Sequence, residues 1–574
     1  MWPSKNLLIL KRIVMKNVKI LAACSLLLLG VSSCDLTGLN DNPNKPSNDV
    51  DYNMNEPRLL GTVRGGKIID GDVEQRLKAL QVDLYSQMVV DGGGWSTANY
   101  VQNDGWNLVI WEQYLKQLAS LNIVIRDLSA RGDAEDYANT IAFARIWRVY
   151  VHSMASDLFG PMPFPKPSDD PEANPPYREM EDIYTEYFAE LDEAPKMFTS
   201  GAKSIFTDKS NDIVYQCDND AWKRFANSLR LRLALRVSEV APNVCKTQAQ
   251  AAINADGGLI SNSKQNAYMP PKADGSWGQD YNYVMFQITW GGPLNMSKSF
   301  EKLVTNIGGV AWPAGVENTT PTLTGDAPIP VSSVHPAKVD PRAPKIFQPS
   351  ITGGNWQGLP YGARSEEQNK GDYVVKNYAE LGYLVKDGGK YNSRPYDVFL
   401  YEEVCFLKAE LFARGILAGD AKHEYEEGVR SSFEKWGVGS QADEYLASTE
   451  KNLAGTSAKY DDQAGAGNTA LEKIITQKYI AGTPDLSWEG WSDKRRLNLP
   501  RLDVAIYRDE TVFGGYSKDI KDPKNFIKRI KYPVKESLVN KDEYNRGVQM
   551  LGGKDNVAAN LWWDKNANYC TSAE

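Results

Sequence analysis

Apolar residues recur at three- and four-residue spacing through long stretches of the chain, a pattern typical of amphipathic helices with one buried face. The predicted helices cover residues 73–90, 108–128, 137–158, 183–198, 222–237, 398–416, 425–436 and 474–480. They come as consecutive pairs joined by short or Pro- and Gly-containing connections, which indicates helix hairpins stacked into an array. We therefore expect a mainly α protein built on a helical hairpin scaffold.

The middle of the chain lacks this spacing. Between about residues 265 and 396, Gly, Pro, Asn, Trp and Tyr cluster, and helical spacing is found only near residues 297–304. We expect long irregular loops with a few short strands here, one of them at residues 372–378. A second irregular segment is predicted at residues 484–556. Long loops inside a compact domain usually carry function.

The N-terminus has the layout of a secretory signal peptide, because Lys16 and Lys19 precede an apolar run at residues 20–29 that small residues follow. The run is shorter than the roughly 20 apolar residues that span a bilayer. It ends in Val31-Ser32-Ser33-Cys34, which is similar to the bacterial lipobox. We expect residues 1–33 to be removed as a signal peptide, with Met15 as the natural start, and Cys34 to be lipidated. The alternative is an ordinary signal peptide with an incidental cysteine.

Residues 34–53 then read as a lipidated cysteine followed by a flexible tether, since they are rich in Asn, Asp, Pro and Ser. A multiply acylated cysteine holds a protein stably at a membrane, whereas a single acyl chain does not. We expect residues 54–574 to form a single folded domain that meets the membrane through this anchor only.

Charge and cysteine content exclude some classes of function. The chain has 65 basic and 73 acidic residues, a formal net charge of −8, and no basic cluster, which argues against a nucleic-acid partner. Cys24 leaves with the signal, and the remaining cysteines are too widely spaced for a zinc site. Cys405 lies in an apolar helical pattern and is predicted to be a buried free thiol. Disulfides remain open among Cys217, Cys245, Cys405 and Cys570.

The 15 Trp and 29 Tyr residues are the unusual part of the composition, because several stand in Gly-, Pro- and Asn-rich segments. Aromatic rings on polar loops suit ligand stacking, although each one taken singly is equally compatible with ordinary packing. The candidate ligand-binding residues are Trp95, Tyr100, Trp277, Tyr281, Trp312, Trp356 and Tyr361. Those on helices at apolar spacing are predicted to be core, namely Trp111, Trp147, Trp222 and Trp436.

Motifs for catalysis and cofactors are largely absent. Residues 61–68 have the Gly and Lys spacing of a phosphate loop, but Ile68 stands where a Ser or Thr is required. The chain has no GxSxG or HExxH segment, and its three histidines are far apart. Carboxylate pairs for glycoside hydrolysis cannot be judged from sequence. We expect no cofactor; a calcium ion stays open, since loop carboxylates such as Asp218 and Asp220 suit a hard cation.

Several segments, in a shared order along the chain, resemble the SusD/RagB family of outer-membrane lipoproteins from Bacteroidetes. Trp222-Lys223-Arg224-Phe225-Ala226-Asn227-Ser228-Leu229, continued by Arg232-Leu233-Ala234-Leu235-Arg236, is similar to one family helix. Asp157-Leu158-Phe159-Gly160-Pro161-Met162-Pro163 is similar to the turn that ends another. Weaker matches are Trp111-Glu112-Gln113-Tyr114, Pro175-Pro176-Tyr177, Asp340-Pro341-Arg342, Gln477-Lys478-Tyr479 and residues 402–410, 491–496 and 529–533.

This resemblance implies a tetratricopeptide-like scaffold whose irregular loops bear the ligand site. It implies a non-enzymatic protein on the outer-membrane surface that captures oligosaccharides and delivers them to a SusC-like TonB-dependent barrel. A peptide-binding role in the same kind of system is the first alternative. A helical glycoside hydrolase and a pure protein scaffold are the others, and they predict product release and no small-ligand pocket, respectively.

Overall fold

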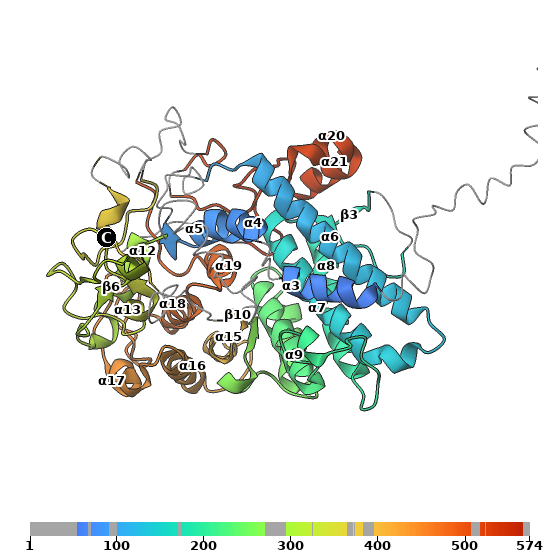
Figure 1. Ribbon diagram of the computed structural model, residues 1–574, viewed down its shortest axis with the longest axis horizontal. Coiled ribbons are helices and arrows are strands. Elements are labelled where there is room, and N and C mark those ends of the chain that lie inside the picture. Colours follow the sequence, from blue (N-terminus) through green and yellow to red (C-terminus); the bar gives the residue numbers. More distant parts are fainter. Residues whose placement is uncertain are drawn as a thin grey trace, which may run out of the picture. The chain divides into compact units, whose positions relative to one another are not determined.

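The structure is a computed structural model that describes residues 54–66, 71–90, 100–169, 174–269, 294–323, 325–363, 371, 373–382, 395–506, 517–522 and 524–565. Cys34 and the predicted signal and tether lie outside these residues. Glu56–Glu574 form one compact unit, built mainly of helices (Figure 1). The predicted mainly α class, with long irregular loops and a few short strands, is confirmed.

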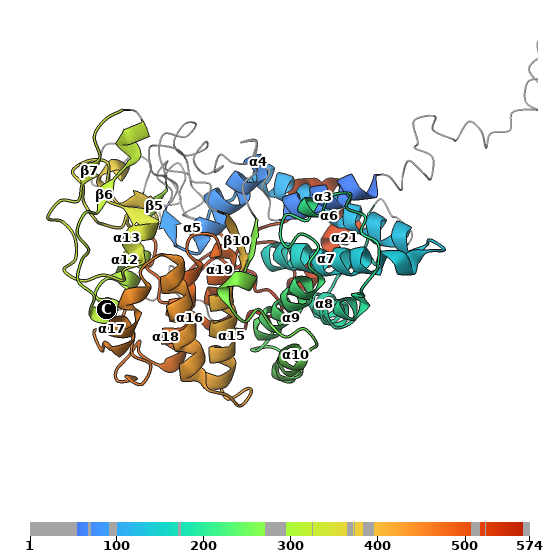
Figure 2. The ribbon, with the colours of Figure 1, turned by 60° about the horizontal axis from the view of Figure 1, so that its bottom comes forward.

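The helices pack as consecutive pairs. In the first half, α6 packs against α7, α8 lies against α7 and α9, and α10 packs against α9. In the second half, α15 pairs with α16 and α18 with α19, while α15 also contacts α9 and joins the two halves. Figure 2 shows α16, α15 and α9 side by side. Their bounds are α6 Asp104–Ser129, α7 Ala138–Phe159, α8 Met180–Glu193, α9 Asn219–Arg236, α10 Pro242–Asn254, α15 Tyr401–Ala413, α16 Ala421–Lys435, α18 Ala470–Gly482 and α19 Ser487–Leu497.

Shorter elements complete the helical part. The other helices are α3 Asn55–Gly66, α4 Gly71–Glu74, a π-helix at Gln75–Val82, α5 Asp83–Tyr85, α12 Lys298–Val304, α13 Ala343–Ile346, α17 Ala442–Ala447, α20 Val534–Val539 and α21 Lys541–Met550. Short 3-10 turns lie at Ala134–Tyr137, Ala194–Met197, Lys209–Asn211, Ser263–Gln265, Ile307–Gly309, Thr320–Leu323, Val375–Asn377 and Gly439–Gln441. Among the described residues, no helix is both long and apolar enough to cross a membrane.

The long helices begin where the sequence supplies a capping side chain. Asn103, Asp218 and Asp420 each accept a hydrogen bond from a backbone N–H in the first turn of α6, α9 and α16. Thr469 and Glu472 form a reciprocal capping box at the start of α18. These contacts satisfy N–H groups that have no partner within the helix.

The predicted core tryptophans are buried at three of the four positions. Trp111, Trp147 and Trp222 are at most 2% exposed. Trp436, at the end of α16, is half-buried and packs at the edge of the cluster formed by α15, α16 and α18. Helical spacing of large aromatics therefore identified the core correctly in the first half of the chain.

Short antiparallel strands organise the loop-rich middle. One sheet has the order β1-β5-β9-β8, formed by Val89–Val90, Asn295–Met296, Glu380–Leu381 and Phe347–Gln348. Paired strands elsewhere are β4 with β10, β2 with β3, and β6 with β7. Their bounds are Ala267–Met269, Tyr396–Phe399, Met162–Pro163, Tyr177–Arg178, Glu317–Asn318 and Ile329–Pro330.

The structure corrects three predictions about where helices and strands lie. The helix predicted at residues 73–90 ends at Tyr85, because Val89 and Val90 pair with β5 more than two hundred residues away. The helix predicted at residues 398–416 begins at Tyr401, since β10 precedes it. The strand predicted at residues 372–378 is wrong where it is described: a 3-10 turn stands there and β9 begins at Glu380. The spacing of apolar residues alone does not distinguish a short apolar strand from the end of a neighbouring helix.

The prediction of irregular structure at residues 484–556 is also wrong in part. This segment contains α19, α20 and α21. Helix α19 buries Glu489, Asp493, Lys494, Arg495 and Arg496 together with Trp491, so most of its buried side chains are charged or polar. A search for apolar residues at helical spacing does not detect such a helix.

Candidate functional site

The candidate aromatics that the structure describes fall into two separate groups. Trp312 contacts Trp356, and Tyr100 contacts Tyr361. Trp95, Trp277 and Tyr281 lie outside the described residues. In the sequence, these residues were selected only because they stand in Gly-, Pro- and Asn-rich segments. The structure shows which of them are neighbours.

Trp312, His335 and Trp356 form what we call the Trp312 cluster. The rings of Trp312 and His335 are stacked, with centroids 4.6 Å apart and planes at 26°. Trp356 meets Trp312 edge-on, with centroids 5.0 Å apart and planes at 71°. Both geometries are favourable for aromatic pairs. The cluster thus presents two stacked rings supported by a third.

Exposure separates the members of this cluster. Trp356 is 1% exposed, whereas Trp312 and His335 are half-buried. The neighbouring Val334 is 39% exposed. Of the four described candidates, Trp312 alone retains surface that a ligand can reach, while Trp356 supports it from below.

Backbone hydrogen bonds fix the loops that carry the cluster. The N–H of Trp312 donates to the carbonyl of Ala337 over 3.0 Å, and the N–H of Trp356 donates to the carbonyl of Val334 over 2.8 Å. Gly354 has a φ of +66°, and a Cβ built there would lie 2.2 Å from the carbonyl oxygen of Pro330. Only glycine allows this close approach between the two loops.

Tyr100, Tyr361, Tyr85 and Phe526 form the second group, the Tyr100 cluster. Tyr100 lies 6.0 Å from Tyr361, 6.3 Å from Tyr85 and 5.9 Å from Phe526 between ring centroids. All four side chains are buried. In this structure these rings contact protein, so Tyr100 and Tyr361 support the fold rather than offering a surface.

A buried carboxyl group connects the loops around the Trp312 cluster to the sheet. Oε1 of Glu380 accepts hydrogen bonds from Asn318 (2.9 Å), Gln348 (3.0 Å) and Thr320 (3.2 Å). Burial raises the pKa of Glu380 to about 7, although these hydrogen bonds act in the opposite direction. Glu380 lies in β9, and its hydrogen bonds therefore connect β9 to β6, to the 3-10 turn that follows β6, and to β8.

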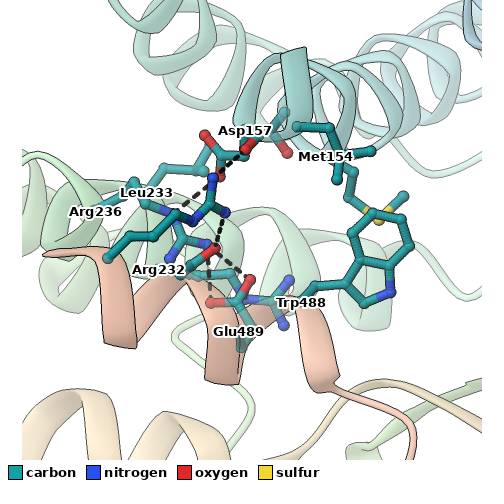
Figure 3. A pocket seen from close by; sticks show the side chains of 11 residues that line it. Met154, Asp157, Arg232, Leu233, Arg236, Trp488 and Glu489 are labelled. Carbon is teal, nitrogen blue, oxygen red and sulfur yellow. Dashed lines mark hydrogen bonds and ion pairs between the residues drawn. The ribbon is translucent and has the colours of Figure 1, made fainter. Parts of the chain in front are cut away.

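A small charged cavity of about 20 Å³ lies between α7, α9 and α19 (Figure 3). Arg236 donates to both carboxylate oxygens of Glu489, over 2.8 and 2.9 Å, and to Asp157 over 2.9 Å. Arg232 donates to both oxygens of Glu403 over 2.7 Å. A space of this size holds about one water molecule.

This cavity does not suit glycoside hydrolysis. A hydrolase of the common type needs a carboxylic acid whose pKa is raised, next to a second carboxylate and a sugar. Burial alone would raise the pKa of Glu489, but Arg236 and Arg232 lower it to about 2. Asp157 is likewise paired with Arg236. The carboxylates here stabilise helix packing.

The described cysteines and carboxylates give no sign of a bridge or a metal. Cys217, Cys245 and Cys405 are free thiols. Cys405 is buried, as predicted, and burial raises its pKa to about 12. Within the described ranges, no group of three or more His, Cys, Asp or Glu side chains is placed to hold an ion. Asp218 caps α9 instead.

Sequence reasoning missed His335 as part of the Trp312 cluster. It stands in a Val-His-Pro segment with no spacing that links it to Trp312. The contact arises because the backbone of Ala337 pairs with Trp312, which places the two rings face to face. Only the fold shows this relationship.

Comparisons with known proteins agree with this architecture. The sequence model of the SusD-like family, described as SusD and RagB outer membrane lipoprotein, matches residues 59–292 and 331–564. No curated protein matches the chain.

Solved structures match along almost the whole chain. A SusD homologue from Parabacteroides distasonis is 65% identical, with a TM-score of 0.85 over 91% of this chain and 100% of that one. A chitin-binding SusD homologue from Flavobacterium johnsoniae is 25% identical, with a TM-score of 0.70 over 90% of this chain and 99% of that one. The resemblance found in the sequence is confirmed, and with it the tetratricopeptide-like scaffold and the outer-membrane location. The chain belongs to the SusD-like family of outer-membrane lipoproteins.

Proposed function

We propose that this protein is a non-enzymatic, surface-exposed lipoprotein that captures oligosaccharides and delivers them to a SusC-like TonB-dependent transporter. Membership of the SusD-like family supports a nutrient-binding role. One relative with the same fold is described as chitin-binding. We extend glycan binding to this chain as a hypothesis.

The observation that carries the proposal is the half-buried Trp312 stacked on His335 and supported by Trp356. A rigid indole on a loop surface suits a sugar, because the apolar CH face of the sugar ring stacks on an aromatic ring. The hydrogen bonds and Gly354 contact described above hold this surface in place without a ligand, which lowers the entropic cost of binding.

Further parts of the proposal rest on residues outside the described ranges. We propose that Cys34 carries the lipid, such as palmitate chains, and that residues 35–53 act as the tether. Trp95, Trp277 and Tyr281 remain candidate ligand contacts. Tyr100, Trp356 and Tyr361 contribute by supporting the binding loops.

A binding screen tests the proposal against its alternatives. The mature protein is run on affinity gels containing polysaccharides and titrated by calorimetry with glycan oligomers and with peptide pools. We expect retardation by at least one glycan, with no release of reducing sugar over the same period. Binding of peptides alone supports the peptide alternative, and product release supports a hydrolase; either result contradicts the proposal.

A further inference from the structure

A second cavity, of about 190 Å³, lies between the start of α7, the loop at residues 198–206 and the start of α9. We call it the α7–α9 cavity. None of its lining residues belongs to the Trp312 or Tyr100 cluster. Cavities of about 150 Å³ lined by apolar side chains bind benzene-sized molecules, so this volume is large enough for an organic ligand.

Four aromatic side chains form the apolar part of the cavity wall, beside polar residues such as Thr140, Ser204 and Asn219. Phe143, Phe206 and Trp222 line it and are 2–8% exposed. The ring centroids of Phe143 and Trp222 are 4.4 Å apart, and those of Phe143 and Phe206 are 6.0 Å apart. A fourth ring, from the half-buried Phe198, also lines the cavity.

Hydrogen bonds fix the loop that closes one side of the cavity. The side-chain amide of Asn139 donates to the carbonyl of Thr199 over 2.9 Å, and its oxygen accepts from the Thr199 N–H over 2.8 Å. Further along the loop, the N–H of Lys203 donates to the carbonyl of Asp136, and the N–H of Ile205 donates to Oγ1 of Thr140. The cavity is therefore preformed.

Asp212 fixes the opposite wall. Its carboxylate accepts hydrogen bonds from the indole N–H of Trp222 over 2.7 Å and from the backbone N–H of Cys217 over 2.8 Å. The N–H groups of Val214 and Tyr215 also donate to it. With four donors, the Asp212 carboxylate is saturated, and the polar atom of Trp222 is occupied.

Cys217 places a half-buried thiol on this wall. Its backbone φ is +63°, and its Sγ lies 3.8 Å from Oγ of Ser204. Burial raises the pKa of the Cys217 thiol, which keeps it uncharged at neutral pH. At the mouth, the Lys203 ammonium is paired with Asp136 over 2.7 Å. The walls thus offer rings, a neutral thiol and the ion-paired Lys203, and the exposed Lys209 also belongs to the lining.

We propose that the α7–α9 cavity binds a small, uncharged aryl compound of benzene to indole size. Ring faces and edges on the wall favour an aromatic ligand over an aliphatic one of equal volume, because edge-to-face and offset contacts add to area burial. A charged ligand would lose part of its hydration against the rings and the neutral thiol of the wall, which is costly. The ligand class is therefore neutral and aromatic.

Cys217 supplies a built-in reporter for the test. The mature full-length protein is treated with iodoacetamide while indole is titrated, and alkylation is followed peptide by peptide with mass spectrometry. We expect indole to slow alkylation at Cys217 several-fold and saturably, while glucose at the same concentrations has no effect. An alkylation rate at Cys217 that does not change with indole overturns the proposal.

A cavity-filling variant provides the second measurement. Ala202 also lines the cavity, and Ala202→Leu adds volume there. Ala447→Leu makes the same change at an exposed position on α17 and serves as the matched control. Ligand-observed NMR should show indole binding to wild type and Ala447→Leu, and at least a tenfold weaker response with Ala202→Leu.

Phe198→Ala removes one of the aromatic rings that line the cavity. It provides a second test of the proposal if Ala202→Leu does not fold. Each variant is compared with wild type by circular dichroism and thermal unfolding. Weaker indole binding by a folded Phe198→Ala protein supports the proposal. Unchanged binding by a folded Ala202→Leu protein contradicts it.

Discussion

Arg496 and Glu410 form a bidentate ion pair inside the helix array, with both N–O distances at 2.5 Å and both side chains at most 1% exposed. The pair joins α19 to α15. Burial opposes the charged form of Glu410, but Arg496 is close enough to lower the pKa of Glu410 to about 2. Asp493 and Arg414 extend the network at either end.

Breaking this pair from one side should be costly. Glu410→Gln leaves the Arg496 guanidinium buried without its full counter-charge, and we expect a loss of about 3–5 kcal/mol in the free energy of unfolding. The double variant Glu410→Leu/Arg496→Met removes both charges and should be more stable than Glu410→Gln. Urea unfolding followed by circular dichroism measures both. A Glu410→Gln protein within about 0.5 kcal/mol of wild type, the usual range of a surface substitution, contradicts the account.

Glu380 should make the protein less stable as the pH rises. This is the reverse of the effect expected from a carboxyl group such as Glu410, whose pKa is lowered in the folded protein. The folded pKa of Glu380, about 7, lies above the ordinary value of 4.5, so the folded protein holds a proton that the unfolded chain has lost. Stability from this group is complete below about pH 4.5 and is lost as the pH rises through 7. The loss is at most about 3 kcal/mol.

Glu380→Gln removes this titration while keeping a similar shape. Unfolding curves between pH 5 and 8 should fall less steeply with pH for Glu380→Gln than for wild type. Exposed Glu317→Gln, on the neighbouring β6, is the matched control and should follow wild type. Parallel curves for Glu380→Gln and wild type would show that Glu380 does not titrate in this range.

Gly354 and its neighbour Gly353 offer a matched pair of substitutions. Both have positive φ, at +66° and +78°, so alanine is strained at either position. Only at Gly354 does the added Cβ meet the Pro330 carbonyl, at 2.2 Å; at Gly353 the nearest atom is 3.7 Å away.

We expect Gly354→Ala to displace the loop that carries Trp356, and to weaken glycan binding at least tenfold. Gly353→Ala should cost about 1 kcal/mol of stability, which is the typical cost of this backbone strain, and should leave binding nearly unchanged. Calorimetric titration and thermal unfolding of the two variants check both statements. Equal binding by the two variants would show that the contact between these loops does not position the site.

Cys34→Ala tests the anchor. Without the acylated thiol, the variant has no lipid attachment to the membrane, and in cells that lack the transporter partner it should move from the outer-membrane fraction to the soluble fraction. Immunoblots of fractionated cells measure this, with Cys217→Ala as the control that leaves the anchor intact. A Cys34→Ala protein that stays in the membrane fraction excludes lipidation at this cysteine.

The helices that the sequence predicted are those whose buried faces are apolar. Trp111 and Trp147 have the spacing of α6 and α7, and both are buried there. Helix α19 was missed because Arg495 and Arg496 lie on its buried side, where their charges are matched by carbonyls and by Glu410. Pairing of charges across sequence-distant helices leaves no periodic signal.

The candidate site was predictable only in part. Trp312 could be proposed as a ligand contact from the loop-like composition around it. The same criterion, however, selected Trp356 and Tyr361, which are buried. His335 could not be found, because its stacking on Trp312 depends on backbone pairing between residues 311–312 and 337–338. Exposure and neighbours are properties of the fold, and residue type alone does not encode them.

Calorimetric titration of wild type and Trp312→Ala with an oligosaccharide that the wild type binds is the most direct test of the central claim. Trp436→Ala is the control for the loss of a tryptophan, because Trp436 is also half-buried and lies at the end of α16. We expect Trp312→Ala to bind at least about tenfold more weakly, equivalent to about 1.4 kcal/mol, and to unfold at nearly the wild-type temperature. Trp436→Ala should bind as wild type does. Equal affinity of Trp312→Ala and wild type for the glycan would contradict the account.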